Sequence, residues 1–181
     1  MIDTQRENLW APWRMEYIRR ITEADRAAPS SAPSCFLCEA AAYPVDSPEA
    51  KERLVLLHDQ RGLIVLNRYP YTNGHVLVAC GDHVGDLTDL STQQRGGLME
   101  LVALAEATLR IAFNPQGFNV GLNLGRCAGA GLPGHLHAHV VPRWSGDTNF
   151  MQTVGEVRVI PDALEHSFEY LSVALGKVGK K

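Results

Sequence analysis

Three histidines lie close together in the segment 135–143, which reads HLHAHVVPR. Side chains alternate between the two faces of a β-strand, so His135, His137 and His139 would share one face at spacings of about 6.5–7 Å, with the residues between them facing the core. A neutral imidazole is a good nucleophile at physiological pH, and its neighbours can fix its tautomer and neutralise charge developing at an attacked phosphorus atom. The segment therefore predicts nucleophilic chemistry in which one histidine attacks and the others orient and stabilise.

Two other interpretations of this segment are open. The histidines could be a chance cluster, although the strict alternation of an uncommon residue argues against this. They could also bind a metal ion, since imidazole is the commonest metal ligand in proteins. Side chains this far apart on one strand do not converge on a single ion without further ligands, so the strand alone does not make a metal site.

Cys35 and Cys38 have the two-residue spacing that lets both thiolates bind one tetrahedral zinc ion. The alternative is a redox-active pair, which ordinarily follows a strand and opens a helix of a βαβ unit. Here the pair follows residues 24–34, which are rich in Ala, Pro and Ser. The sequence therefore favours zinc, with Cys80 and Cys127 expected to be buried small hydrophobic residues instead of ligands.

Short β-rich runs bounded by turn-like residues predict the strands that hold these groups. The short links between the first three runs favour antiparallel pairing, and a glycine-rich loop at 125–134 separates the last two. The expected strands are residues 54–58, 63–67, 75–80, 117–123 and 135–141.

Two helices are expected. The first runs from about Ser91 to Ala112, because Ser91 and Gln94 are spaced as a capping box and apolar residues follow on one stripe. The second starts at Pro161, with apolar residues at helical spacing. The order of elements predicts an α+β fold, in which an antiparallel sheet of about five strands carries the long helix and the C-terminal helix on one face. The two apolar stripes are Leu98, Leu101, Val102, Ala105 and Leu109, and Leu164, Phe168, Leu171 and Leu175.

The chain of 181 residues, 45% of them hydrophobic and 20% charged, fits one compact domain. We expect residues 1–34 to form an aromatic segment and a connector, and residues 35–181 to form the domain. A net charge of -3 gives no basic footprint for polymeric nucleic acid. The apolar runs are too short to span a membrane, and charged residues interrupt the first twenty positions, which leaves no secretory signal. These features predict a cytoplasmic protein.

Histidines that alternate with apolar residues and continue into Pro-Arg resemble the signature of the histidine-triad family. Two upstream segments, LNRYP at 66–70 and GHVLV at 74–78, resemble the nucleotide-binding half of that family. Further segments resemble the branch that contains actinobacterial diadenosine-tetraphosphate phosphorylases. These are LWAPWR at 9–14, FNVGLNLG at 118–125, and PRW at 142–144 with Gly146, Asp147, Asn149 and Phe150.

The resemblance implies that His137 forms a covalent nucleotidyl intermediate, that His139 positions it and binds the α-phosphate, and that His75 borders the same phosphate. The residues themselves also permit turn roles for Asn67 and Asn123 and a packing role for Trp144. The implied nucleotide-binding positions are Asn67 at the ribose hydroxyls, Asn123 and His139 at phosphate, Gly131 in the loop, and Trp144 as a wall of the pocket.

The loop before the triad departs from the family. Where its members present Gly followed by Ser or Gln, this chain has Ala130 and Gly131, which removes a side-chain donor to the phosphates. Backbone N–H groups of the loop 125–134 could replace that donor as an anion nest. The resemblance also implies that His83 and His135 complete a structural Cys2His2 zinc site with Cys35 and Cys38, and that the protein is a homodimer.

The leading hypothesis is a nucleotidyl transferase that acts on dinucleoside polyphosphates, such as diadenosine tetraphosphate, with orthophosphate as acceptor. One alternative is a hydrolase of dinucleoside polyphosphates or nucleoside phosphoramidates, in which water takes the nucleotidyl group from His137. An alternative from another class is a non-catalytic nucleotide-binding scaffold.

Overall fold

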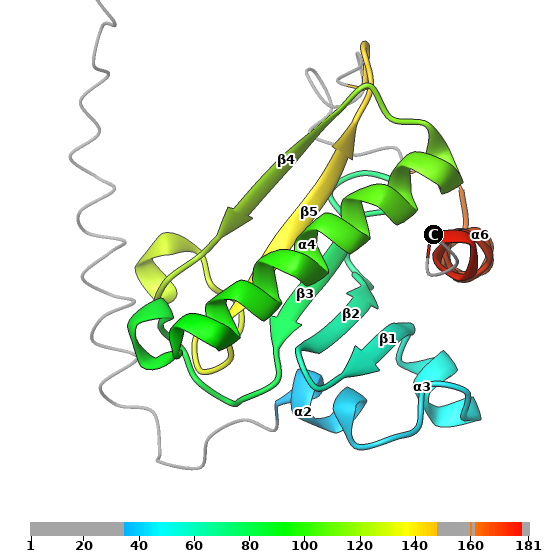
Figure 1. Ribbon diagram of the computed structural model, residues 1–181. Coiled ribbons are helices and arrows are strands. Elements are labelled where there is room, and N and C mark those ends of the chain that lie inside the picture. Colours follow the sequence, from blue (N-terminus) through cyan, green and yellow to red (C-terminus); the bar gives the residue numbers. More distant parts are fainter. Residues whose placement is uncertain (1–34, 148–159, 161, 179–181) are drawn as a thin grey trace, which may run out of the picture. The chain divides into compact units, whose positions relative to one another are not determined.

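The computed structural model describes residues 35–147, 160 and 162–178 (Figure 1). Within these residues the chain forms the predicted five-stranded antiparallel sheet, in the order β1-β2-β3-β5-β4. The expectations for residues 1–34 and for Asn149 and Phe150 lie outside the described residues. The strands are β1 (Val55–Asp59), β2 (Gly62–Leu66), β3 (Val76–Cys80), β4 (Gly117–Leu122) and β5 (His137–Arg143).

The last strand begins two residues later than expected, which places His135 outside it. A turn causes the shift, because the backbone N–H of His135 donates back to the carbonyl of Leu132 at 3.4 Å. The next N–H, that of Leu136, donates to the carbonyl of Val84 at 2.6 Å. His135 is thereby directed toward the loop after β3, away from the row of histidines on β5.

Two helices pack on one face of the sheet, α4 (Thr92–Phe113) and α6 (Leu164–Val178) (Figure 1). The capping box of α4 is formed as predicted: the hydroxyl of Ser91 accepts from Gln94 N, and the side chain of Gln94 accepts from Ser91 N. Helix α4 ends at Asn114, which has a left-handed backbone with φ of 46°. All five residues of the predicted α4 stripe are buried against strand residues and against Phe168 and Leu171 of α6.

Two short helices that the sequence did not predict, α2 (Phe36–Ala41) and α3 (Pro48–Glu52), cover part of the opposite face. Their buried residues join a second core cluster with β1, β2 and β3, so the expectation of helices on one face only was wrong. Five- and six-residue helices are too short to show a periodic stripe. The start of α3 did have a signal, since Ser47 caps the helix and Pro48 occupies its first position.

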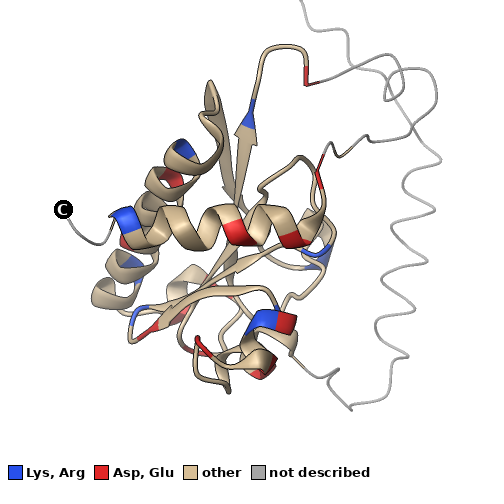
Figure 2. Cartoon of the chain, turned by 90° about the vertical axis from the view of Figure 1, so that its right-hand side faces the viewer, with Lys and Arg blue, Asp and Glu red and all other residues tan. Residues whose placement is uncertain are grey.

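The second core cluster contains no residue of β4 or β5 among the described residues, so α2 and α3 leave the triad-bearing side of those strands open. Basic and acidic side chains are interspersed along the helices (Figure 2), in keeping with the small net charge. None of the described helices has the length and apolarity needed to cross a membrane.

Candidate active site and metal centre

The register of the sheet places two of the three triad histidines side by side on the open face. His137 pairs with Ala79 of β3, and His139 pairs with Leu77 of β3 and with Gly121 of β4. The intervening residues Leu136, Ala138 and Val140 are buried in the core beneath α4, as the alternation predicts.

The ring of His137 is held in one tautomer. Its Nδ1 lies 2.8 Å from the backbone carbonyl of His135, and because a carbonyl only accepts, Nδ1 must carry the proton. Nε2 therefore holds the lone pair of a neutral imidazole. The ring is 7% exposed, so little of it is hydrated. This arrangement presents a nucleophilic nitrogen in a fixed direction.

Behind His137, a chain of hydrogen bonds fixes His139. The backbone N–H of Tyr71 donates to Nδ1 of His75 at 3.1 Å, so the proton of His75 is on Nε2. That Nε2 lies 3.0 Å from Nδ1 of His139 and donates to it. The proton of His139 is then on its own Nε2, where it can be donated to a phosphate oxygen. His75 is fully buried, and its hydrogen bond to Nδ1 holds the ring of His139 in one orientation.

His139 should stay neutral at physiological pH. Burial lowers its pKa below the ordinary value of 6.5, and the electrostatic effect of the neighbouring His137 ring lowers that pKa further. Protonating Nδ1 would break the hydrogen bond from His75. We therefore expect kcat/KM to have its acid-side midpoint below pH 6.5 in a pH–rate profile, with an NMR titration assigning that midpoint to His139.

The same shift has a consequence for stability. Below pH 6.5 His139 binds a proton in the unfolded chain while it stays neutral in the folded one. The free energy of unfolding should therefore fall as the pH drops through that range. An acid-side midpoint of His139 above pH 6.5 would contradict both expectations.

Two cavities lie on this side of the sheet. One of about 320 Å³ is lined by α2, β2 and β3 residues that include Asn67, Leu66 and Leu77. The other, of about 420 Å³, is lined by β4 and β5 residues that include His139 and Asn123. Gly131 and Trp144 line neither of these two cavities. The structure thus places Asn67 at the smaller cavity and Asn123 with His139 at the larger one, while His137 lies beside His139 on β5 and lines neither. The predicted roles of Gly131 and Trp144 remain predictions.

The two asparagines have partners within the protein. Nδ2 of Asn67 lies 3.2 Å from Nδ1 of His75, and its Oδ1 accepts from Tyr69 N at 3.0 Å. Nδ2 of Asn123 donates to the carbonyl of Gly129 at 3.4 Å. In the same loop, the N–H groups of residues 128, 129 and 130 donate to loop carbonyls. An anion nest in this loop would therefore depend on its other N–H groups.

The sequence did not single out a charged cluster in the larger cavity. Arg143 follows His139 by four residues on β5 and so shares its face. Its guanidinium donates to the carboxylate of Asp147 and, through Nη1, to Oδ1 of Asn119 at 2.7 Å. The hydrogen bond that Arg143 donates to Asp147 raises the pKa of Arg143 above its usual value. The period of two that identified the histidines would also have identified Arg143.

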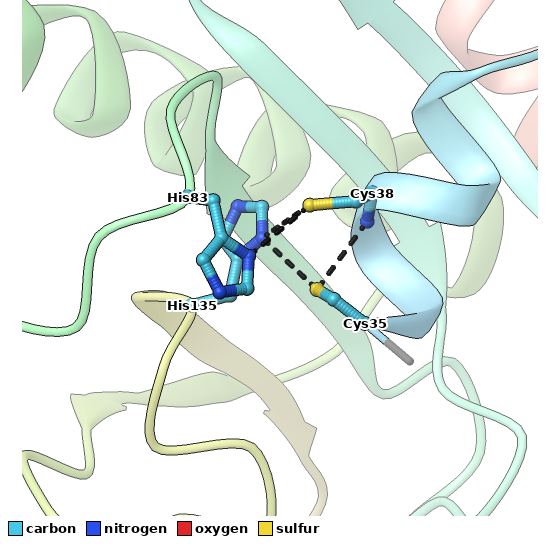
Figure 3. A group of neighbouring side chains, drawn as sticks. All are labelled: Cys35, Cys38, His83 and His135. Carbon is cyan, nitrogen blue, oxygen red and sulfur yellow. Dashed lines mark hydrogen bonds between the residues drawn. The ribbon is translucent and has the colours of Figure 1, made fainter. Parts of the chain in front are cut away.

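A separate cluster gathers Cys35, Cys38, His83 and His135, whose ligand atoms all lie within 4.8 Å of one another. Figure 3 shows the cysteines of α2 facing the histidine that follows β3 and the one that precedes β5. Nδ1 of His135 lies 3.2 Å from Sγ of Cys35 and 3.4 Å from Sγ of Cys38, and Nδ1 of His83 lies 3.2 Å from Sγ of Cys38. Sulfur and nitrogen ligands of one tetrahedral zinc ion lie about 3.5 Å apart, so the spacing fits.

The chemistry of the donors fits a cation as well. Nε2 of His135 donates to the carbonyl of Cys80 at 3.0 Å, which leaves Nδ1 unprotonated and directed at the sulfurs. Burial and the neighbouring Cys35 raise the pKa of Cys38 to about 11. The Cys38 thiol therefore resists ionisation until a cation neutralises the thiolate.

The other cysteines differ in their surroundings. Cys80 is buried as expected, whereas Cys127 is exposed, so the expectation that both are buried was wrong for Cys127. Its three-residue 3₁₀ turn at 126–128 lies on the surface with no buried residue. The Cys35–Cys38 pair does open a helix, α2, and the coordinating histidines are what distinguish it from a redox pair.

Comparisons with known proteins agree with this geometry. The HIT domain model matches residues 48–146. The chain is 36% identical over 168 residues to the AP-4-A phosphorylase of Mycobacterium tuberculosis, covering 93% of this chain and 84% of that protein. A solved Zn-bound histidine triad family protein from Mycobacterium smegmatis superimposes with a TM-score of 0.65 at 30% identity, covering 81% of this chain and 96% of that one. A histidine triad nucleotide-binding protein from Sulfolobus tokodaii shares the fold, with a TM-score of 0.59 at 22% identity over 71% of this chain and 87% of that one.

Proposed function

This chain belongs to the histidine-triad family defined by the HIT domain, and on that basis we propose that it transfers nucleotidyl groups from dinucleoside polyphosphates, such as diadenosine tetraphosphate, to orthophosphate. The observation that carries the proposal is the tautomer of His137, whose Nε2 lone pair is held ready on the open face of the sheet. The similarity to a phosphorylase over most of the chain supports orthophosphate as acceptor.

The reaction takes place in two displacements. Nε2 of His137 attacks the α-phosphorus, so a P–N bond forms while the P–O bond to the next phosphate breaks, and the leaving nucleotide departs with that electron pair. An oxygen of orthophosphate then attacks the same phosphorus and the P–N bond breaks. Diadenosine tetraphosphate and orthophosphate would thus yield ATP and ADP, with His137 regenerated.

The other site residues act around this centre. The proton on Nε2 of His139 would stabilise the phosphate oxygens as negative charge builds on them. His75 holds that ring in place through the bond to its Nδ1. Asn67, at the edge of the smaller cavity, would contact the ribose hydroxyls, and Asn123, in the larger one, would contact phosphate.

We also propose that Cys35, Cys38, His83 and His135 hold a structural zinc ion. The fit of the four donors supports this, as does the similarity to a Zn-bound relative. When bound, the ion would tie α2 to the turn before β5 without an open coordination position, so it would stabilise the fold and take no part in the reaction.

A homodimer and a cytoplasmic location complete the proposal. Strand β4 is at the edge of the sheet, and an edge strand of a second copy could pair with it. Val120 on this strand is 48% exposed, and Leu124 just beyond it is 40% exposed, which supports an interface there. Thiolate ligands persist best in a reducing compartment, which supports the cytoplasm.

The reaction is tested by incubating the protein with diadenosine tetraphosphate with and without orthophosphate. We expect ADP and ATP in equal amounts, at a rate that depends on the phosphate concentration. AMP produced at a rate independent of phosphate would replace this proposal with the hydrolase alternative. Absence of any turnover, with nucleotide binding retained, would instead favour the scaffold.

A further inference from the structure

We propose that the larger cavity, on β4 and β5, binds the leaving nucleotide of the substrate and then the attacking orthophosphate. This assignment rests on the proposed function, because it concerns the same reaction at His137. It gives the open face of the two strands a chemical role, and it identifies Arg143, Asn119 and Gly121 as residues that select the leaving group and the acceptor.

The sheet register gives the direction in which a substrate would lie. Val65, Leu77, His139 and Gly121 pair in succession and form one row across four strands. The smaller cavity is lined by Val65 and Leu77, at one end of the row, and the larger cavity by His139 and Gly121, at the other. A nucleotide whose α-phosphate is at the histidines therefore has one cavity on each side of that phosphate.

The two cavities differ in chemistry. The smaller one has apolar walls from Leu54, Val65, Leu66 and Leu77, which suit a nucleoside base. The larger one is lined by the polar side chains of Thr72, Asn119, Asn123, Arg143 and Asp147. The guanidinium of Arg143 and the side-chain amides are the donors that phosphate oxygens require, whereas the carboxylate of Asp147 accepts hydrogen bonds from Arg143. We therefore assign the first nucleoside to the smaller cavity and the rest of the polyphosphate chain to the larger one.

Arg143 is held in position to receive phosphate. Asp147 accepts from its Nε and Nη2, and Asn119 accepts from its Nη1. A guanidinium has five N–H groups. The contacts among described residues use three of them, so two remain to be shared with a ligand. Tyr71, whose ring stacks on that of His139 with centroids 5.8 Å apart, lines the same cavity and offers an aromatic surface beside it.

One site can serve both displacements. The leaving oxygen departs from the side of the phosphorus opposite His137, and the acceptor must approach from that same side to displace the histidine in line. Orthophosphate therefore enters the space that the leaving nucleotide vacates. Donors that hold the departing phosphate chain also hold the incoming phosphate, which favours phosphate over water as the acceptor.

Gly121 provides a direct test. A Cβ built at this position meets no atom within 4 Å, so leucine can be introduced without a clash and would extend into the cavity beside His139. Gly176 on α6 is the control, because a Cβ there also meets nothing within 4 Å and the residue lines neither cavity. Gly176→Leu reports any effect of a glycine-to-leucine change away from the site.

The experiment compares equilibrium binding of AMP and of diadenosine tetraphosphate by calorimetry, with His137→Ala as the background to prevent turnover. We expect Gly121→Leu, which fills part of the cavity, and Arg143→Gln, which removes charge-assisted hydrogen bonds, each to weaken binding of the dinucleotide about 10-fold or more. Binding of AMP, which fills only the smaller cavity and the α-phosphate position, should change less than about twofold. Gly176→Leu should leave both affinities unchanged.

Equal losses for AMP and the dinucleotide, or no loss for either, would overturn the assignment even if the wild-type protein phosphorolyses its substrate. In the active protein, Gly121→Leu should raise the KM for orthophosphate, and an unchanged KM would overturn the acceptor role. If the wild-type protein instead releases AMP without phosphate, the proposed function fails, while selective weakening of dinucleotide binding would still support the leaving-nucleotide site.

Discussion

Replacing His137 with alanine should lower kcat for phosphorolysis by roughly 10⁴-fold or more, as is usual when the nucleophile of a covalent mechanism is removed. The reason lies in the geometry. The carbonyl of His135 fixes the proton on Nδ1, so Nε2 is the atom that forms the P–N bond. His139 cannot replace it, because its Nδ1 accepts from His75 and its Nε2 carries a proton. Steady-state assays with saturating substrate, at an enzyme concentration high enough to detect slow turnover, would measure the loss.

Trapping the intermediate gives an independent measurement. Phosphorus–nitrogen bonds survive alkaline denaturation, so an alkaline quench followed by mass spectrometry should detect one nucleotidyl group on the peptide containing His137. His139→Ala is the matched control: it keeps the nucleophile, so the adduct should still form, with a loss of about 10²–10³-fold from the missing donor. An adduct on another residue, or a His137→Ala protein that retains turnover, would refute the mechanism.

Removing the metal site should have the largest effect on stability. Cys38→Ser takes one thiol donor from the four-residue cluster at an exposed position, with little change in side-chain size. Structural zinc sites contribute a substantial part of folding free energy. A loss of about 4 kcal/mol would lower Tm by about 10 °C in a chain of this size. Metal analysis should find about one zinc ion per wild-type chain and far less in the variant.

Cys127→Ser is the control for that prediction, because the same substitution at an exposed thiol outside the cluster should change neither zinc content nor Tm. Well below the Tm of the variant, kcat of Cys38→Ser should remain within about 10-fold of wild type, since a closed structural site takes no part in the chemistry. Equal Tm values for Cys38→Ser and the wild type would remove the zinc proposal.

The sequence predicted best where a local pattern determines local structure. The capping box at Ser91 and the stripe from Leu98 to Leu109 are enough to define α4, and both are present. Strand periodicity likewise placed His137 and His139 on one face. It failed at His135, because this residue lies in a turn closed by a hydrogen bond to the carbonyl of Leu132 and the next N–H donates to Val84 on another loop, neither of which has a signal in a period of two.

The site was predicted only in part for a similar reason. A CxxC spacing is compatible with a metal site or a redox pair, and the resemblance supplied the two histidines from elsewhere in the chain. The pairing of Arg143 with Asn119 connects residues 24 apart on neighbouring strands, so it depends on the sheet register. The proton positions on His75 and His139 also depend on the three-dimensional structure. The hydrogen bond from Tyr71 to His75 is formed within a turn, and the one from His75 to His139 joins residues that are distant in sequence.

His135 contributes to two properties of the molecule through different atoms. Its ring faces the cysteines, while its peptide oxygen holds the proton of His137. Every amino acid has that oxygen, so mutation at this position can abolish ion binding and still leave the attacking tautomer in place. The two traits are therefore separable in evolution: a lineage could lose its dependence on zinc supply, provided that new packing replaced the lost stability, without having to reinvent its chemistry.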